Sequence, residues 1–181
     1  MQKIQVTLKN GEKVIGDRFD ISDFKKIKSI LKRCFELNKD LNSLGGRKLN
    51  IPDVVSEGIY CYLFNATRTN GTAYSYDAVD IQTGEGIQIK SASIDKDCTS
   101  FGPTSEWDKL IFEDFAPNGT NDGTIAFYHV PSEYIYSSIL NHNKNETFID
   151  QQKQGRRPRL SLKEIINHHN IKPLKVINIM E

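Results

Sequence analysis

Three residues near the middle of the chain could together bind a divalent metal. Asp77 lies in one candidate strand, and Gln88 and Lys90 lie in the next, across a glycine-rich turn. Residues two apart in a strand face the same side, so Gln88 and Lys90 should project together beside Asp77, while Ile87 and Ile89 point to the opposite, buried face. A magnesium ion could then take the Asp77 carboxylate, the Gln88 amide oxygen and a backbone carbonyl near Ile89.

This set of groups fits the hydrolysis of phosphodiesters. A bound metal neutralises phosphate charge and lowers the pKa of water, and the Lys90 ammonium would stabilise the developing negative charge. Gln88 departs from the ideal, because a neutral amide binds Mg²⁺ more weakly than a carboxylate. The acids that could supply the missing charge are Glu57, Glu85, Asp80 and Asp95. We favour Glu57, because a helix packed beside the hairpin would bring it to the metal.

The same pattern has a simpler interpretation. An acid followed by a turn and Gln-x-Lys occurs by accident in many strands, and the alternation of Gln88 and Lys90 is most often the solvated face of a sheet. Taken alone, the spacing is therefore a weak indication of function.

The elements before the hairpin are predicted to be two strands and two helices. Ile4, Val6 and Leu8 alternate with polar residues before an Asn-Gly turn, which predicts an N-terminal hairpin. Ser22 is the expected cap of a long apolar helix that ends near Gly45. Its stripe either packs on the core or pairs with a second subunit. Pro52 and Asp53 start a second helix, over residues 51–65.

The rest of the chain is predicted to be a strand meander followed by helices. Strands are expected at residues 74–81, 86–94, 110–112, 125–130 and 174–177, and helices begin at Pro131 and Ser161. A charged loop is expected at residues 154–159. This order predicts one α+β, or mixed α/β, domain.

Composition limits the compartment and the partners. The chain has 24 basic and 23 acidic residues, a net charge of +1, so a polyanion would have to bind a local basic patch. Three cysteines without metal-ligand spacing indicate reduced thiols in a cytoplasmic protein. No apolar run approaches the ~20 residues needed to span a bilayer, so no membrane partner is expected.

The hairpin resembles the active-site hairpin of PvuII-like type II restriction endonucleases of the PD-(D/E)xK superfamily. The residues that carry this resemblance are 77–80 and 88–91, where the family has an acid before a Glu-x-Lys-Ser strand. Residues 52–57, 100–104 and 107–110 also resemble a group of small endonucleases that cut GCNGC, of the LlaDII type. That second resemblance extends from about Ile51 to the C-terminus.

The resemblance implies a restriction-endonuclease-like fold with a central mixed β-sheet flanked by helices. It also implies a homodimer that uses Mg²⁺ to cut a short pseudo-palindromic site in double-stranded DNA, with residues 1–181 as one endonuclease domain. The hairpin and helix at residues 1–46 would contribute to dimerisation. By this analogy Asp77 is the metal-binding acid and Lys90 the catalytic lysine, and Gln88 occupies the position of the family's Glu.

Two segments are candidates for DNA contact. Lys96, Thr99 and Ser100 follow the catalytic strand and are the expected base readers, with Asp97 accepting from cytosine N4. The candidates for phosphate or guanine contact are Arg156, Arg157 and Arg159, with Arg68 as a weaker backbone contact. Charged surface loops are the alternative for both segments. The histidines show no paired metal spacing and are assigned no role.

The functional hypothesis is a type II restriction endonuclease that uses Asp77, Gln88, Lys90 and Glu57. One rival is a non-catalytic DNA-binding module that keeps the fold, in which Gln88 marks the loss of the metal. Another is a repair or junction nuclease without sequence specificity.

Overall fold

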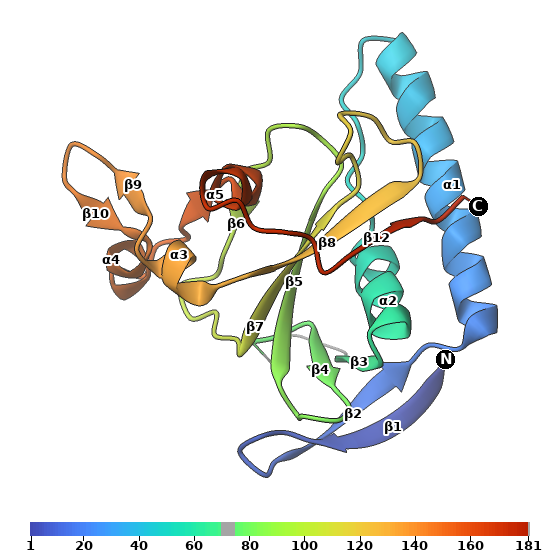
Figure 1. The fold of residues 1–181 in the computed structure, drawn as a ribbon, viewed down its shortest axis with the longest axis horizontal. Helices are drawn as coiled ribbons and strands as arrows, with labels where there is room; N and C mark the ends of the chain where they lie inside the picture. The colour runs from blue at the N-terminus through green and yellow to red at the C-terminus, as the bar shows by residue number, and fades with distance from the viewer. Residues whose placement is uncertain (70–74, 181) are drawn as a thin grey trace.

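The computed structural model describes residues 1–69 and 75–180, and it shows an α+β protein with an eight-stranded mixed sheet (Figure 1). The strands of this sheet are β1 (Gln2–Thr7), β2 (Lys13–Arg18), β3 (Ala66–Thr69), β4 (Ala78–Asp80), β5 (Gly86–Ala92), β7 (Lys109–Asp114), β8 (Thr124–Val130) and β12 (Lys175–Asn178). They lie in the order β1-β2-β3-β4-β5-β7-β8-β12, so most neighbours in space are neighbours in sequence. The predicted fold class is confirmed.

One pair of strands departs from the expected meander. Strands β5 and β7 run parallel, with Gln88 opposite Leu110 and Lys90 opposite Phe112, whereas the other pairs of the sheet are antiparallel. A parallel pair needs a crossover of a dozen or more residues, and residues 93–108 provide it. The expectation of a simple meander was wrong here. The crossover returns the chain to the end of the sheet where β5 begins, so β7 runs in the same direction as β5.

Helices cover both faces of the sheet. The helices are α1 (Ile21–Ser43), α2 (Asp53–Leu63), α3 (Ser132–Tyr136), α4 (Phe148–Lys153) and α5 (Leu162–His168). Helices α1 and α2 lie over one face, and the three short helices lie on the other side, as Figure 1 shows. Among the helices in the described part of the chain, none is long and apolar enough to cross a bilayer.

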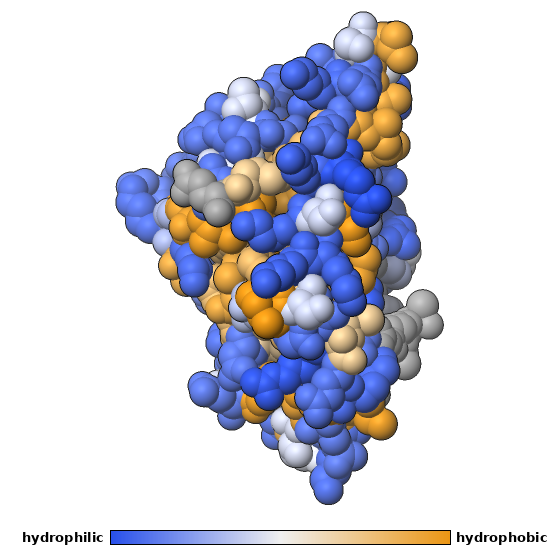
Figure 2. Space-filling view, turned by 90° about the vertical axis from the view of Figure 1, so that its right-hand side faces the viewer, coloured by the Kyte–Doolittle hydropathy of each residue, from blue (hydrophilic) through white to orange (hydrophobic). Residues whose placement is uncertain are grey.

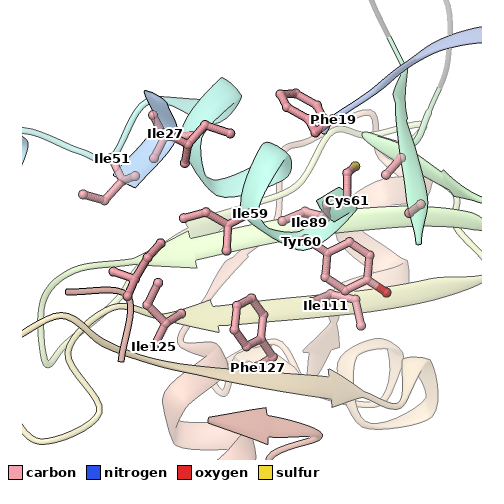
Figure 3. Close-up of a cluster of buried hydrophobic side chains, with 14 of the residues drawn as sticks. Phe19, Ile27, Ile51, Ile59, Tyr60, Cys61, Ile89, Ile111, Ile125 and Phe127 are labelled. Carbon is pink, nitrogen blue, oxygen red and sulfur yellow. The ribbon is translucent and has the colours of Figure 1, made fainter. Parts of the chain in front are cut away.

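Two apolar clusters, one on each face, hold these layers together. The first packs α1 and α2 on the sheet through side chains that include Ile59, Ile89 and Phe127 (Figure 3). The second lies beneath the short helices and includes Phe112 and Phe148. Because Ile89 points into the first cluster, Gln88 and Lys90 are directed to the other side of β5, as the alternation predicted.

Several predicted elements are confirmed with small shifts. The N-terminal hairpin forms, and Gly11 takes the positive φ of +86° that its turn requires. The cap of α1 is Asp20 and not Ser22, because Asp20 and Asp23 form a reciprocal capping box. The strand expected at residues 74–81 appears as β4, and residue 74 itself lies outside the described residues.

The short elements were not predicted. They are β3 and α4 together with β6 (Thr99–Ser100), β9 (Ile139–Asn141), β10 (Glu146–Thr147) and β11 (Arg159–Leu160). Strand β6 pairs with β11, and β9 pairs with β10 as a separate two-stranded hairpin. Figure 1 shows this hairpin projecting from the body of the protein beside α4.

The linker between α1 and α2 is fixed to α1 by one buried side chain. The Asn38 amide donates to the Leu49 carbonyl at 3.1 Å, and its oxygen accepts from the Leu49 N–H at 2.6 Å. Asn38 is 2 % exposed, so both bonds are shielded from water. This pairing determines where the chain enters α2.

We expect Asn38→Ala to lower the free energy of unfolding by about 1–3 kcal/mol, because it leaves the two Leu49 backbone groups without their partner. Urea unfolding would measure the loss. The matched control is Asn42→Ala on the exposed part of the same helix, which should change stability by less than about 0.5 kcal/mol. Equal values for the two variants would contradict the role given to Asn38.

Candidate functional site

A cleft of about 370 Å³ opens between the start of α2 and the end of β5; we call it the central cleft. One wall consists of the linker and the first turns of α2, including Asp53 and Glu57. The other consists of residues 89–94 and 96–100, which belong to β5, the loop after it and β6. The cleft therefore brings together segments that are far apart in the sequence.

Asp77 is not a lining residue of this cleft, but it is attached to β5 at Ile89, which lines the cleft. Its Oδ2 accepts from the Ile89 backbone N–H at 2.7 Å and from the Gln88 side-chain amide. The N–H and C=O of one strand residue point to the same side, so the Ile89 carbonyl also faces Asp77. The structure thus brings Asp77, Gln88 and Ile89 together, as the hairpin pattern predicted.

Glu57 enters the cleft from α2 and forms an ion pair with Arg68 of β3. Burial and the charge of Asp77 raise the pKa of Glu57 to about 7, although Arg68 acts in the opposite direction. Glu57 therefore lies close enough to Asp77 for the two carboxylates to repel each other. A cation between them would relieve that repulsion.

Lys90 supplies a positive charge on the same strand. It lines the cleft, and its Nζ lies 5.5 Å from the centre of the Phe101 ring, within the range of a cation–π contact. The Lys90 charge lowers the pKa of Asp77, while burial has the larger effect and raises it. Asp77 and Lys90 are therefore electrostatically coupled across the hairpin.

The other acids considered as partners of Asp77 lie elsewhere. Asp80 accepts from the backbone N–H groups of residues 82 and 83 in the hairpin turn, and Glu85 pairs with Lys9 and Lys109. Asp95 lines a separate surface hollow. Within residues 1–69 and 75–180, Glu57 is the one acid of these four that lines the central cleft.

Asp53 is an acid of this cleft that the sequence did not reveal. It was interpreted as a helix-starting residue, and it is indeed the first residue of α2. It also lines the cleft one helical turn before Glu57, and its charge raises the pKa of both Glu57 and Asp77. The i, i+4 spacing of Asp53 and Glu57 was the signal that could have indicated it.

A further carboxylate, Glu113, lies buried in the sheet near the cleft. It belongs to β7, is 0 % exposed, and neither of its oxygens has a hydrogen-bond partner among the residues that the structure describes. Burial raises the pKa of Glu113, and the charge of Glu57 raises it further. Burial and the neighbouring charge of Glu57 therefore both favour the neutral form of Glu113.

The two segments predicted to contact DNA meet in one ribbon. Strand β6 pairs antiparallel with β11, so Ser100 lies opposite Arg159 and Thr99 lies opposite Leu160. Thr99 and Ser100 line the central cleft, as does Lys96 before them. Candidate contacts about 60 residues apart in sequence thus lie side by side, a short loop after the end of β5.

Asp97 and Arg68, which were also expected to contact DNA, form interactions within the chain. Asp97 is 7 % exposed, and its oxygens accept from Thr99, from Ser161 and from the backbone of residues 162 and 163. It thereby fastens the loop after β5 to the start of α5. Arg68 is turned toward Glu57. The sequence did not reveal the contacts of Asp97 with the start of α5, which are more than 60 residues away.

The arginine loop divides into paired and exposed side chains. Arg156 forms an ion pair with Glu146 of the β9–β10 hairpin. Arg157 and Arg159 are exposed, and neither forms an ion pair with a residue of the described chain. The structure therefore leaves two of the three guanidinium groups open to a partner.

Comparison with known proteins gives a consistent match. A family model described as Bsp6I restriction endonuclease matches residues 19–168. The chain is 32 % identical over 146 residues to the type II restriction enzyme Bsp6I of Bacillus sp. (strain RFL6), an alignment that covers 80 % of this chain and 81 % of that enzyme. No solved structure matches the chain significantly.

We expect Glu113→Gln to reduce the pH dependence of stability. Because its folded-state pKa is raised, Glu113 binds a proton on folding, so stability falls as pH rises from its ordinary value of 4.5 toward the raised one. The loss is about 1.4 kcal/mol per pH unit at most. Urea unfolding without metal at several pH values between 5 and 9 would show a flatter slope for the variant.

The exposed acid Glu36 on α1 offers the matched control. Glu36→Gln should keep the slope of the wild-type protein. If Glu113→Gln also kept it, Glu113 would already be ionised in the fold.

Proposed function

This chain belongs to the Bsp6I restriction endonuclease family, and from that premise we propose that its central cleft is the active centre of a Mg²⁺-dependent type II enzyme. The family membership makes the protein a site-specific deoxyribonuclease. The observation that carries the assignment of the site is the attachment of Asp77 to β5 beside Lys90.

The donor groups of the cleft suit a hard cation. Asp77 and Glu57 contribute carboxylates with raised pKa values, and the Ile89 carbonyl faces Asp77. Within the described residues no three His, Cys, Asp or Glu side chains converge as a ligand set. Mg²⁺ commonly binds through one or two carboxylates and keeps several waters, so this sparse set fits it.

We assign the following roles to the chain's own groups. Bound Mg²⁺ would neutralise phosphate charge and make water a better nucleophile. Asp77, Glu57 and the Ile89 carbonyl would hold the ion. Gln88 keeps Asp77 in place through its amide hydrogen bond, and this explains how a neutral residue serves where the PvuII-like pattern has an acid.

Lys90 is the proposed catalytic lysine. Its ammonium would lie against the scissile phosphate and stabilise the negative charge that develops as water attacks phosphorus and the P–O bond breaks. The Phe101 ring under the side chain limits its rotamers, so that the charge is already in place before DNA binds.

Sequence reading is proposed to come from the ribbon beside the cleft. Lys96, Thr99 and Ser100 would face the bases near the scissile phosphate, while Arg157 and Arg159 would contact phosphates or guanine O6 and N7. We propose GCNGC as the target on the basis of the resemblance to endonucleases that cut this sequence. Arginine and lysine contacts suit its guanines.

We further propose that residues 1–181 act as one endonuclease domain and that two copies pair through α1. A stripe of apolar residues follows heptad spacing on α1 and its C-cap: Ile30, Cys34, Leu37, Leu41 and Leu44. Ile30 and Cys34 pack partly against the first cluster of the same chain, so the exposed part of the stripe begins at Leu37. Leu37 is 46 % and Leu44 85 % exposed. Figure 2, which looks onto the side where α1 lies, shows apolar patches between hydrophilic areas. A two-fold pair would present two clefts to a pseudo-palindromic site.

Digestion of an unmethylated plasmid with purified protein and Mg²⁺ tests the proposed function. Discrete fragments whose ends map to GCNGC are expected. Fragments with other common ends would refute the target alone, and smearing would indicate a nuclease without sequence specificity. Absence of cleavage would favour the non-catalytic module that Gln88 suggested.

We expect Lys90→Ala to reduce cleavage by at least about 10²-fold, because a charge that stabilises the transition state is lost. Asp77→Ala should behave similarly. Specific DNA binding measured with Ca²⁺ should persist in Lys90→Ala. The matched control is Lys13→Ala on β2, which should cleave normally. Normal cleavage by Lys90→Ala would remove Lys90 from the mechanism.

We expect Leu37→Glu combined with Leu41→Glu to convert a dimer into monomers, because two charges would face the apolar stripe of the second copy. Sedimentation velocity would measure the mass. Ser29→Glu, on the exposed side of the same helix, should leave the dimer intact. A dimer that survives the double substitution would place the interface elsewhere.

A further inference from the structure

A second hollow of about 740 Å³ lies between the β9–β10 hairpin and α5; we call it the hairpin groove. Among the described residues, four bases line it, His142, Arg159, His168 and His169, against one acid, Glu164. Three of the four histidines of the chain therefore gather here, beside hydroxyl and apolar side chains.

The hairpin groove begins one strand away from the central cleft. Ser100 of β6 lines the central cleft, and its register partner Arg159 of β11 lines the hairpin groove. Neighbouring strands are about 4.8 Å apart. A polymer that lies in the central cleft can therefore continue across this ribbon into the hairpin groove.

Positive charge is concentrated in the segment that runs from β9 to α5. From the start of β9 to the end of α5, residues 139–168, there are six Lys or Arg and three Asp or Glu, a net charge of +3. The whole chain carries +1, so the remainder is net negative. Arg156 and Lys163 are neutralised by Glu146 and Asp114. Lys144, at the hairpin tip, has no ion-pair partner among the described residues.

Two of the three imidazoles make ring contacts before any ligand binds. The His169 ring stacks on Tyr134 with 3.7 Å between ring centroids and 3° between planes, and His168 meets His169 edge to face at 4.7 Å. Both histidines are exposed, as is His142 in the hairpin turn. Imidazole N–H groups donate hydrogen bonds, and such donors suit phosphate oxygens.

We propose that the hairpin groove binds the DNA backbone beyond the recognition sequence, with His142 and His168 as phosphate contacts. This inference rests on the proposed function, because the DNA must first occupy the central cleft. Contacts of this kind position the duplex and raise affinity without reading sequence. Glu164 is the one acid lining the groove in the described chain, and it would weaken this binding.

Binding to duplexes of two lengths tests the proposal. Each carries one GCNGC at its centre, in 12 or 30 base pairs, and binding is measured with Ca²⁺ in place of Mg²⁺. We expect the wild-type protein to bind the 30-base-pair duplex more tightly. The double variant His142→Gln/His168→Gln should lose about tenfold on the long duplex, the effect of two lost hydrogen bonds, and less than about twofold on the short one.

A variant that is expected to strengthen DNA binding and a control variant complete the experiment. Glu164→Gln should bind the long duplex more tightly and the short one unchanged, while Glu12→Gln in the turn before β2 should affect neither. Equal losses on both lengths, or no loss, would overturn the proposal. If the protein did not cleave plasmid but the histidine substitutions still weakened binding only to the long duplex, the proposed nuclease function would be refuted and DNA binding by the hairpin groove would be supported. If the protein cleaved plasmid but the substitutions had no effect that depends on duplex length, only the proposal for the hairpin groove would be refuted.

Discussion

The hydrogen bond from the Ile89 N–H to the Asp77 carboxylate is the interaction on which the central cleft depends. It extends the β4–β5 hairpin through a side chain, at the point where the backbone pairing of these strands has ended. Asp77 is thereby held against the strand that carries Lys90. The Asp77 backbone is also paired with Ile87 and with Thr69, so the bond from the Ile89 N–H mainly fixes the direction of the Asp77 carboxylate relative to β5.

The surroundings of this bond concentrate negative charge in a partly buried place. Asp53, Glu57 and Asp77 repel one another, and Arg68 and Lys90 offset part of that repulsion. Buried carboxylates that repel one another lower the stability of a fold, and such destabilising clusters are common at the functional sites of enzymes. Glu113, buried without a partner in the adjacent strand, belongs to the same arrangement. The large apolar clusters on both faces of the sheet stabilise the fold and offset this electrostatic repulsion.

Local patterns in the sequence were sufficient for the parts of the fold that local physics determines. The alternation around Ile87 and Ile89, the turn at Gly11 and the apolar stripe of α1 each depend on residues close in sequence. Asp77, Gln88 and Ile89 could be placed together for the same reason, since one hairpin holds them. The parallel return of β7 depends on a crossover, which carries no periodicity that a sequence pattern would reveal.

The remaining parts required contacts between distant segments. Two-residue strands such as β6 and β11 are too short to show an alternation of apolar and polar residues. They form because each pairs with the other, and the two are about 60 residues apart in sequence. Asp97 looked like an exposed loop acid, and only its bonds to the start of α5 show its structural role. Asp53 and Glu57 were visible as a helix start and a helical acid, but their common direction into the cleft follows from how α2 packs on the sheet.

The pairing of β6 with β11 also governs when the cleft becomes complete during synthesis. Asp77, Gln88 and Lys90 leave the ribosome well before Arg159 and Leu160, which hold the wall formed by Thr99 and Ser100. A nascent chain therefore has its acids and its lysine while the surface that would receive the duplex is still unformed. The order of translation thus places the acids and the lysine outside the ribosome before the neighbouring wall of the cleft can form.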